Sequence, residues 1–127
     1  MNGPSTPPAD HGVDERALDA LRALDGDDEP GFYAGVLRKF LAQGDALLAE
    51  LRRAIAARDT ASIARVAHGW KGSSGQLGVR VLYDACVEAE RAAKSGDVHA
   101  ARRSVEAAAE AFARARPRLE REAAPSA

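Results

Sequence analysis

The chain has 127 residues, of which 46% are hydrophobic, 5% aromatic and 29% charged, with 18 Lys and Arg against 19 Asp and Glu. This length and balance predict one soluble globular domain. Because the chain contains 29 alanines and few aromatic residues, its core must be built mainly from Ala, Leu and Val at close range. That composition favours an all-α fold over an all-β or α/β fold.

The composition also argues against several classes of function. No apolar run approaches the roughly 20 residues needed to span a bilayer, and the Pro-rich start lacks the regions of a signal peptide. We therefore expect a cytoplasmic protein without membrane contact. Cys86, the only cysteine, excludes an internal disulfide and a Cys-based zinc site. Residues 31–127 carry 16 basic and 11 acidic residues, but these are interleaved without a basic block, which argues against nucleic-acid binding.

The two ends of the chain are expected to be disordered. Residues 1–12 and 122–127 combine Pro, Gly, Ser, Ala or Asp without apolar periodicity, and the folded domain is expected over 13–121. Within it, residues 13–24 predict a short amphipathic helix. From residue 30 to 55, apolar side chains recur at helical spacing over about seven turns, which makes this the most regular helix of the chain.

Three further helices follow at short intervals. Asp59 or Thr60 is suited to cap a helix that reaches Leu77, a fourth is expected over 79–94, and Asp97 is suited to cap the last. Pro117 should kink or end that last helix near Arg116. Connections this short place neighbouring helices antiparallel. The predicted architecture is an antiparallel up-down four-helix bundle with a short additional N-terminal helix.

Four glycines interrupt the third helix, in the segment AHGWKGSSGQLG that spans 67–78. Each costs about 1 kcal/mol relative to Ala within a helix, which indicates selection for something other than stability. At about 100° per residue, His68 lies opposite the apolar positions, such as Trp70. Its neighbours on that outward face are small or cationic: Ala61, Ala64, Arg65, Lys71, Gly72 and Gly75.

Such an exposed imidazole is accessible to a large partner and to an anion. These are the requirements of a nucleophilic histidine that accepts a phosphoryl group, but a solvated surface histidine beside a Gly/Ser-rich helix end fits the same pattern. Neither a GxxxxGK[ST] loop nor a GxSxG elbow is present. His68, Cys86 and His99 fall on separate predicted helices without metal-ligand spacing, so we expect no metal site and assign Cys86 to the core.

The segment AHGWKGSSGQLG, followed by Leu82, Cys86 and Glu90, resembles the signature of histidine-containing phosphotransfer (HPt) domains of bacterial multistep two-component systems. In that family an alanine precedes the phosphorylated histidine, and a lysine, a glycine, small residues and a Leu-Gly pair follow it. A cysteine and a glutamate come one helix later. The matching residues here are Ala67, His68, Lys71, Gly72, Ser73, Ser74, Leu77, Gly78, Cys86 and Glu90. The resemblance extends over about residues 14–120.

The resemblance implies a phosphocarrier rather than an independent enzyme. His68 would accept a phosphoryl group from the aspartate of one receiver domain and pass it to another, with Mg²⁺ in the receiver and no cofactor in this chain. Lys71 would offset charge on the phosphoryl oxygens. Glu90 would accept a hydrogen bond from Nδ1–H of His68, although an acid at the end of an amphipathic helix is also consistent with a solvated side chain.

The partners that the resemblance implies are response-regulator receiver domains and a hybrid sensor histidine kinase, which would bind this domain as a monomer. The expected partner-binding residues are Ala64, Arg65, Gly69, Gly72 and Gly75. An alternative is a docking or regulatory module of the same fold that works without phosphorylation. An enzyme using His68 as a general base would need a second catalytic group, and the sequence supplies no candidate near it.

Overall fold

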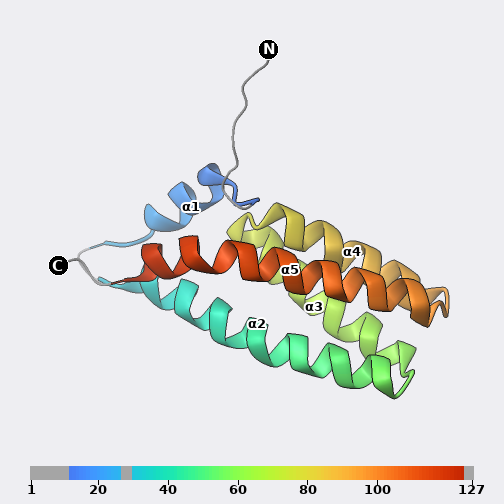
Figure 1. The fold of residues 1–127 in the computed structure, drawn as a ribbon. Coiled ribbons are helices and arrows are strands. Elements are labelled where there is room, and N and C mark those ends of the chain that lie inside the picture. Colours follow the sequence, from blue (N-terminus) through green and yellow to red (C-terminus); the bar gives the residue numbers. More distant parts are fainter. Residues whose placement is uncertain (1–11, 27–29, 125–127) are drawn as a thin grey trace, which may run out of the picture.

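The described part of the chain, residues 12–26 and 30–124 of a computed structural model, consists of helices joined by short connections (Figure 1). Within it, four long helices run alternately up and down: α2 (Phe32–Ala56), α3 (Thr60–Leu77), α4 (Arg80–Lys94) and α5 (Val98–Ala123). Helix α1 (Glu15–Arg22) is short and lies at one end of this bundle. Helices α3 and α5 each pack against both α2 and α4. The predicted all-α bundle with an additional N-terminal helix is confirmed.

Aspartate side chains begin three of the helices. Asp14 accepts a hydrogen bond from the backbone N–H of Arg16, Asp59 from Ser62 and Asp97 from Ala100. Each bond satisfies an N–H group that has no partner inside its helix. Of the two caps considered for α3, Asp59 is therefore the one used.

The core is rich in alanine and leucine, with one row of aromatic rings through its middle. Phe112 of α5 makes edge-to-face contacts with Phe40 of α2 and Trp70 of α3, with ring centroids 5.9 and 5.4 Å apart. Alanines such as Ala67 and Ala101 are fully buried around this row and let the helices approach closely. Among the described residues, no helix has both the length and the apolar character needed to cross a membrane.

Helix α5 continues through Pro117 to Ala123. Of the two outcomes expected for Pro117, a kink or an end near Arg116, the end is therefore wrong. Pro117 is exposed, and water can therefore satisfy the carbonyl that loses its intrahelical partner. Beyond the proline, Leu119 and Ala123 are buried in the core. The tail expected over 122–127 is wrong for residues 122 and 123, which are helical; residues 125–127 lie outside the described part.

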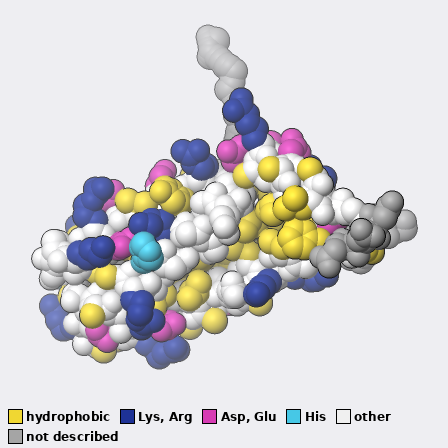
Figure 2. All heavy atoms as spheres, turned by 180° about the vertical axis from the view of Figure 1, so that it is seen from behind, with side chains coloured by type: hydrophobic (Ala, Val, Ile, Leu, Met, Phe, Trp, Pro, Cys, Tyr) yellow, Lys and Arg dark blue, Asp and Glu magenta, His cyan; other side chains and the backbone are white. Residues whose placement is uncertain are grey.

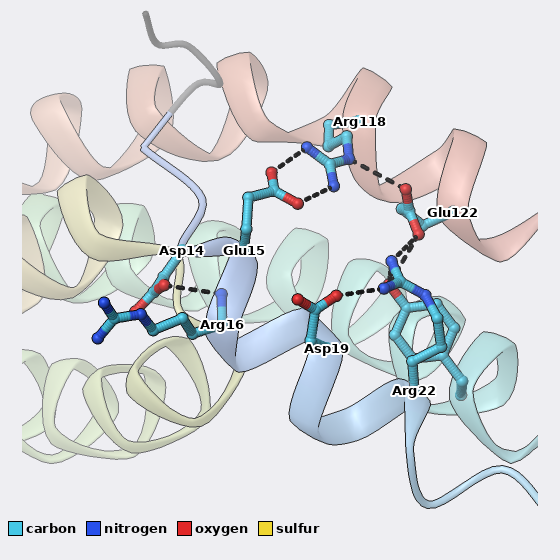
Figure 3. Close-up of polar contacts among 8 residues, drawn as sticks. Asp14, Glu15, Arg16, Asp19, Arg22, Arg118 and Glu122 are labelled. Atoms are coloured by element: carbon cyan, nitrogen blue, oxygen red, sulfur yellow. Dashed lines mark hydrogen bonds and ion pairs between the residues drawn. The ribbon is translucent and has the colours of Figure 1, made fainter. Parts of the chain in front are cut away.

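The N-terminal segment is tied to the bundle by the side-chain contacts drawn in Figure 3 and by backbone hydrogen bonds. The sequence predicted neither. The N–H of Asp14 donates to the carbonyl of Gly78, and the N–H of Arg80 donates to Gly12, each over 2.7 Å. Gly12, expected at the end of a disordered stretch, is thus paired; residues 1–11 are outside the described part.

Two arginine–glutamate contacts hold α1 against α5. Arg118 donates two hydrogen bonds to Glu15, and Glu122 accepts hydrogen bonds from Arg22 and from the Tyr33 hydroxyl. The pKa of Glu122 is kept below its usual value by hydrogen bonds from Arg22, Tyr33 and Arg118. The carboxylate is therefore ionised in this cluster. Helix α1 is therefore fixed against α5 at one end of the bundle.

Candidate functional site

His68 lies near the middle of α3 and points away from the core. Its side chain is 67% exposed, whereas Ala67 and Trp70 on the same helix are fully buried. The helical spacing of 100° per residue places these side chains on opposite faces. The predicted outward position of His68 is confirmed.

Helix α4 brings Glu90 against the imidazole. Oε2 of Glu90 is 3.1 Å from Nδ1 of His68 and 3.0 Å from Nζ of Lys94. Oε1 accepts a hydrogen bond of 2.8 Å from Nζ of Lys71. The Glu90 side chain is only 9% exposed. It is therefore a buried carboxylate with three partners and not a solvated acid.

The two lysines stabilise the ionised form of this carboxylate. Hydrogen bonds from Lys71 and then from Lys94 lower the pKa of Glu90 from 4.5 to about 2. In turn, the hydrogen bond to Glu90 raises the pKa of Lys71. An ionised carboxylate only accepts hydrogen bonds, so Nδ1 of His68 must be the donor. In the neutral ring, Nε2 is then the unprotonated nitrogen, and Glu90 does not engage it.

The glycines around His68 divide into two kinds. A Cβ on Gly69 or Gly72 would meet nothing within 4 Å, so neither glycine is needed for packing inside the domain. A Cβ on Gly75 would lie 3.2 Å from the ring of Tyr83, and Gly78 adopts a left-handed φ of 75° at the end of α3. The expectation that all four glycines serve something other than stability is thus wrong for Gly78, whose left-handed conformation favours glycine.

The remaining predicted partner-binding residues lie on the same face of α3. Arg65 is exposed and lies 3.6 Å from Glu50 of α2, and Ala64 beside it is half-buried.

Figure 2 shows a hydrophobic patch near α1, on a side of the molecule where a histidine side chain is also visible. A shallow pocket there is lined in part by Leu21, Leu24, Phe32 and Val36.

Sequence reasoning missed Lys94. It stands four residues after Glu90 on α4, which is the spacing at which a glutamate and a lysine meet on one helix face. This spacing was the available signal. Cys86 is buried, and burial raises the pKa of its thiol to about 12, which confirms its position in the core. Among the described residues no group of three or more His, Cys, Asp or Glu could hold a metal ion.

The model of the Hpt domain family matches residues 35–121. The chain belongs to the Hpt domain family. The match includes α3 and α4, the two helices that carry His68, Lys71, Glu90 and Lys94 of this Hpt domain.

Two relatives illustrate the similarity of this Hpt domain to known proteins. The crystal structure of histidine-containing phosphotransfer protein B from Pseudomonas aeruginosa PAO1 is 28% identical and superposes with a TM-score of 0.81, covering 88% of this chain and 94% of that one. Multistep phosphorelay regulator 1 of Schizosaccharomyces pombe is 30% identical over 74 residues, or 58% of this chain. The Hpt domain spans only 25% of the length of that yeast protein.

Proposed function

We propose that this Hpt domain is a phosphorelay intermediate that carries a phosphoryl group on Nε2 of His68. The observation that supports this most directly is the pairing of Nδ1 with the buried carboxylate of Glu90, 3.1 Å away, on an imidazole that is otherwise exposed. The pairing orients the ring and leaves Nε2 with its lone pair toward solvent. The domain is accordingly a phosphocarrier and not an independent enzyme.

In the proposed step, the lone pair of Nε2 attacks the phosphorus of a receiver domain's aspartyl phosphate. The new N–P bond forms as the P–O bond to the aspartate breaks, and the aspartate leaves as a carboxylate. The ring keeps its proton on Nδ1 and becomes positively charged. Glu90, ionised and in contact with Nδ1–H, stabilises that charge. Transfer to a second receiver is the reverse of this step.

Lys71 supplies a positive charge on the same helix as His68. Its ammonium lies against Glu90, one turn of α3 from His68, and is 26% exposed. From there it would offset charge on the phosphoryl oxygens. Mg²⁺ and the remaining electrostatic stabilisation would come from the receiver domain, so this chain would need no cofactor of its own.

The surface around His68 supports docking of a whole protein domain. Gly69 and Gly72 present no side chain, and the space above them is open. We propose that receiver domains of response regulators and of a hybrid sensor histidine kinase bind here to a monomer of this chain. That contact would be bordered by half-buried Ala64 and by exposed Arg65 and Gly75.

The decisive experiment is incubation with a receiver domain carrying labelled aspartyl phosphate. Wild-type protein should acquire an acid-labile, base-stable label, and His68→Gln should acquire none. Because His68 is exposed, this variant should keep the helix content and unfolding midpoint of the wild type. If His68→Gln is still labelled, the acceptor assignment is wrong. If the wild type binds the receiver but is never labelled, the phosphorylation-independent docking module is correct instead.

A further inference from the structure

Glu90 is held by two lysines on different helices, although one would neutralise its charge. Lys71 of α3 contacts Oε1, and Lys94 of α4 contacts Oε2, over 2.8 and 3.0 Å. Oε2 is also the oxygen that lies against Nδ1 of His68. The cluster of His68, Lys71, Glu90 and Lys94 therefore has one positive charge in excess when the imidazole is neutral.

The two lysines differ in what else they can do. Lys71 follows His68 by one helical turn, so its ammonium can turn from Oε1 toward a group on Nε2. Lys94 follows Glu90 by four residues on the same helix, so its contact with Glu90 is local and independent of α3. A carboxylate as buried as Glu90 is costly when it has no cation beside it. The ammonium of Lys71 can therefore leave Oε1 of Glu90 only if another cation stays beside the carboxylate.

We propose that Lys94 is a positioning residue that keeps the carboxylate of Glu90 neutralised and against Nδ1 of His68 while Lys71 moves to the phosphoryl group. This rests on the function proposed above, since it assigns Lys71 to the transferring group. Lys94 acts through Glu90 and does not touch the phosphoryl oxygens. Its effect must therefore depend on the negative charge of Glu90.

The charge dependence gives a direct test with four variants. Lys94→Gln removes the ammonium, Glu90→Gln removes the charge that it neutralises, and a third protein carries both changes. Arg91→Gln is the matched control, because Arg91 is an exposed cation of the same helix that pairs with Glu88 instead of Glu90. The receiver-to-His68 transfer rate and the lifetime of phosphohistidine are measured for each.

We expect Lys94→Gln to slow transfer and to shorten the phosphohistidine lifetime, each on the order of fivefold, and Arg91→Gln to leave both within twofold of wild type. Adding Lys94→Gln to Glu90→Gln should neither slow transfer further nor shorten the phosphohistidine lifetime further, because no carboxylate at position 90 then needs a cation. If Lys94→Gln is as harmful in the Glu90→Gln background as in the wild type, Lys94 acts on the phosphoryl group or the receiver directly and the proposal is overturned. Equal losses from Arg91→Gln, or no loss from Lys94→Gln, also overturn it.

A second measurement distinguishes a failure of the role proposed for Lys94 from a failure of the proposed phosphorelay function. Phosphoramidate phosphorylates histidine without any receiver domain, so the lifetime of phospho-His68 can be compared among the same variants with no protein partner present. If wild type accepts phosphate from phosphoramidate but never from a receiver, the proposed function fails. If a receiver labels the wild type and the lifetime is unchanged by Lys94→Gln in both assays, the role of Lys94 fails and the proposed function stands.

Discussion

The ring of Phe112 on α5 occupies the space that a side chain on Gly44 of α2 would take. A Cβ built on Gly44 would lie 2.3 Å from Cζ of Phe112. The same ring makes the edge contacts with Phe40 and Trp70 that form the aromatic row of the core. Gly44 therefore sets how closely α2 and α5 approach, and it does so by packing and not by backbone conformation.

Gly44→Ala should consequently destabilise the domain although alanine is the better helix former. The gain in helix propensity is about 1 kcal/mol, whereas forcing a methyl group into a filled core costs about 1–3 kcal/mol. Gly35→Ala is the matched control, since a Cβ on Gly35 of the same helix meets nothing within 4 Å. Urea unfolding should show a lower midpoint for Gly44→Ala and an equal or higher one for Gly35→Ala. A stabilised Gly44→Ala protein would contradict this packing.

Substitutions of Gly72 test whether the open space beside His68 gives a receiver domain access to the imidazole. Both Gly72→Ala and Gly72→Gln should stabilise the isolated domain by up to about 1 kcal/mol, because either residue favours the helix and a Cβ at this position meets nothing within 4 Å. Gly72→Gln should nevertheless weaken receiver binding by about tenfold or more, because its side chain would clash with the docked receiver. Calorimetry measures this affinity. Unchanged affinity for the receiver would mean that the glycine is not there for access.

Lys71→Ala should act on the transfer step and not on docking. An ammonium that stabilises the transferring group changes the rate of the chemical step, whereas one used equally before and during transfer changes affinity. Transfer should slow by about tenfold or more, with little change in binding of the unphosphorylated receiver. Arg103→Ala on α5 removes the same charge from an exposed position away from the site. Equal effects from both variants would indicate general steering of an acidic receiver surface instead.

The carboxylate of Glu90 should make the domain sensitive to acid. Its pKa is lowered from 4.5 to about 2 by hydrogen bonds from Lys71 and Lys94, so its contacts stabilise the fold fully above pH 4.5 and are lost as the pH falls toward 2. The stability difference between wild type and Glu90→Gln should shrink over that interval. Urea midpoints measured across it test this, and a difference that stays constant would contradict the assignment.

Local sequence signals were sufficient for much of this architecture. The repeat of apolar residues located all five helices of the described chain. Asp97 marked the start of one helix, and the choice between Asp59 and Thr60 marked the start of another, where Asp59 is the cap. The angular spacing of residues along α3 placed His68 on the outer face. These features depend on neighbours within one or two turns, which is the range that a periodic pattern encodes.

Features that join distant segments could not be predicted in the same way. The contact between Gly44 and Phe112 depends on how α2 and α5 are aligned, and Tyr83 reaches Gly75 only because α4 folds back along α3. Helix α5 passes Pro117 because Leu119 is buried beyond it. In each case tertiary packing decides the outcome over a local preference.

The contact between Arg22 and Glu122 joins positions 100 residues apart in the sequence. The first and last helices of the described chain therefore meet at one end of the bundle, while the turn between α4 and α5 lies at the other end (Figure 1). A circular permutant follows from this arrangement: the chain can be opened in the exposed turn at Ser95 and Gly96 and its former ends joined by a flexible linker. All five helices, the Asp97 cap of α5 and the cluster around His68 are then retained in a chain of different connectivity.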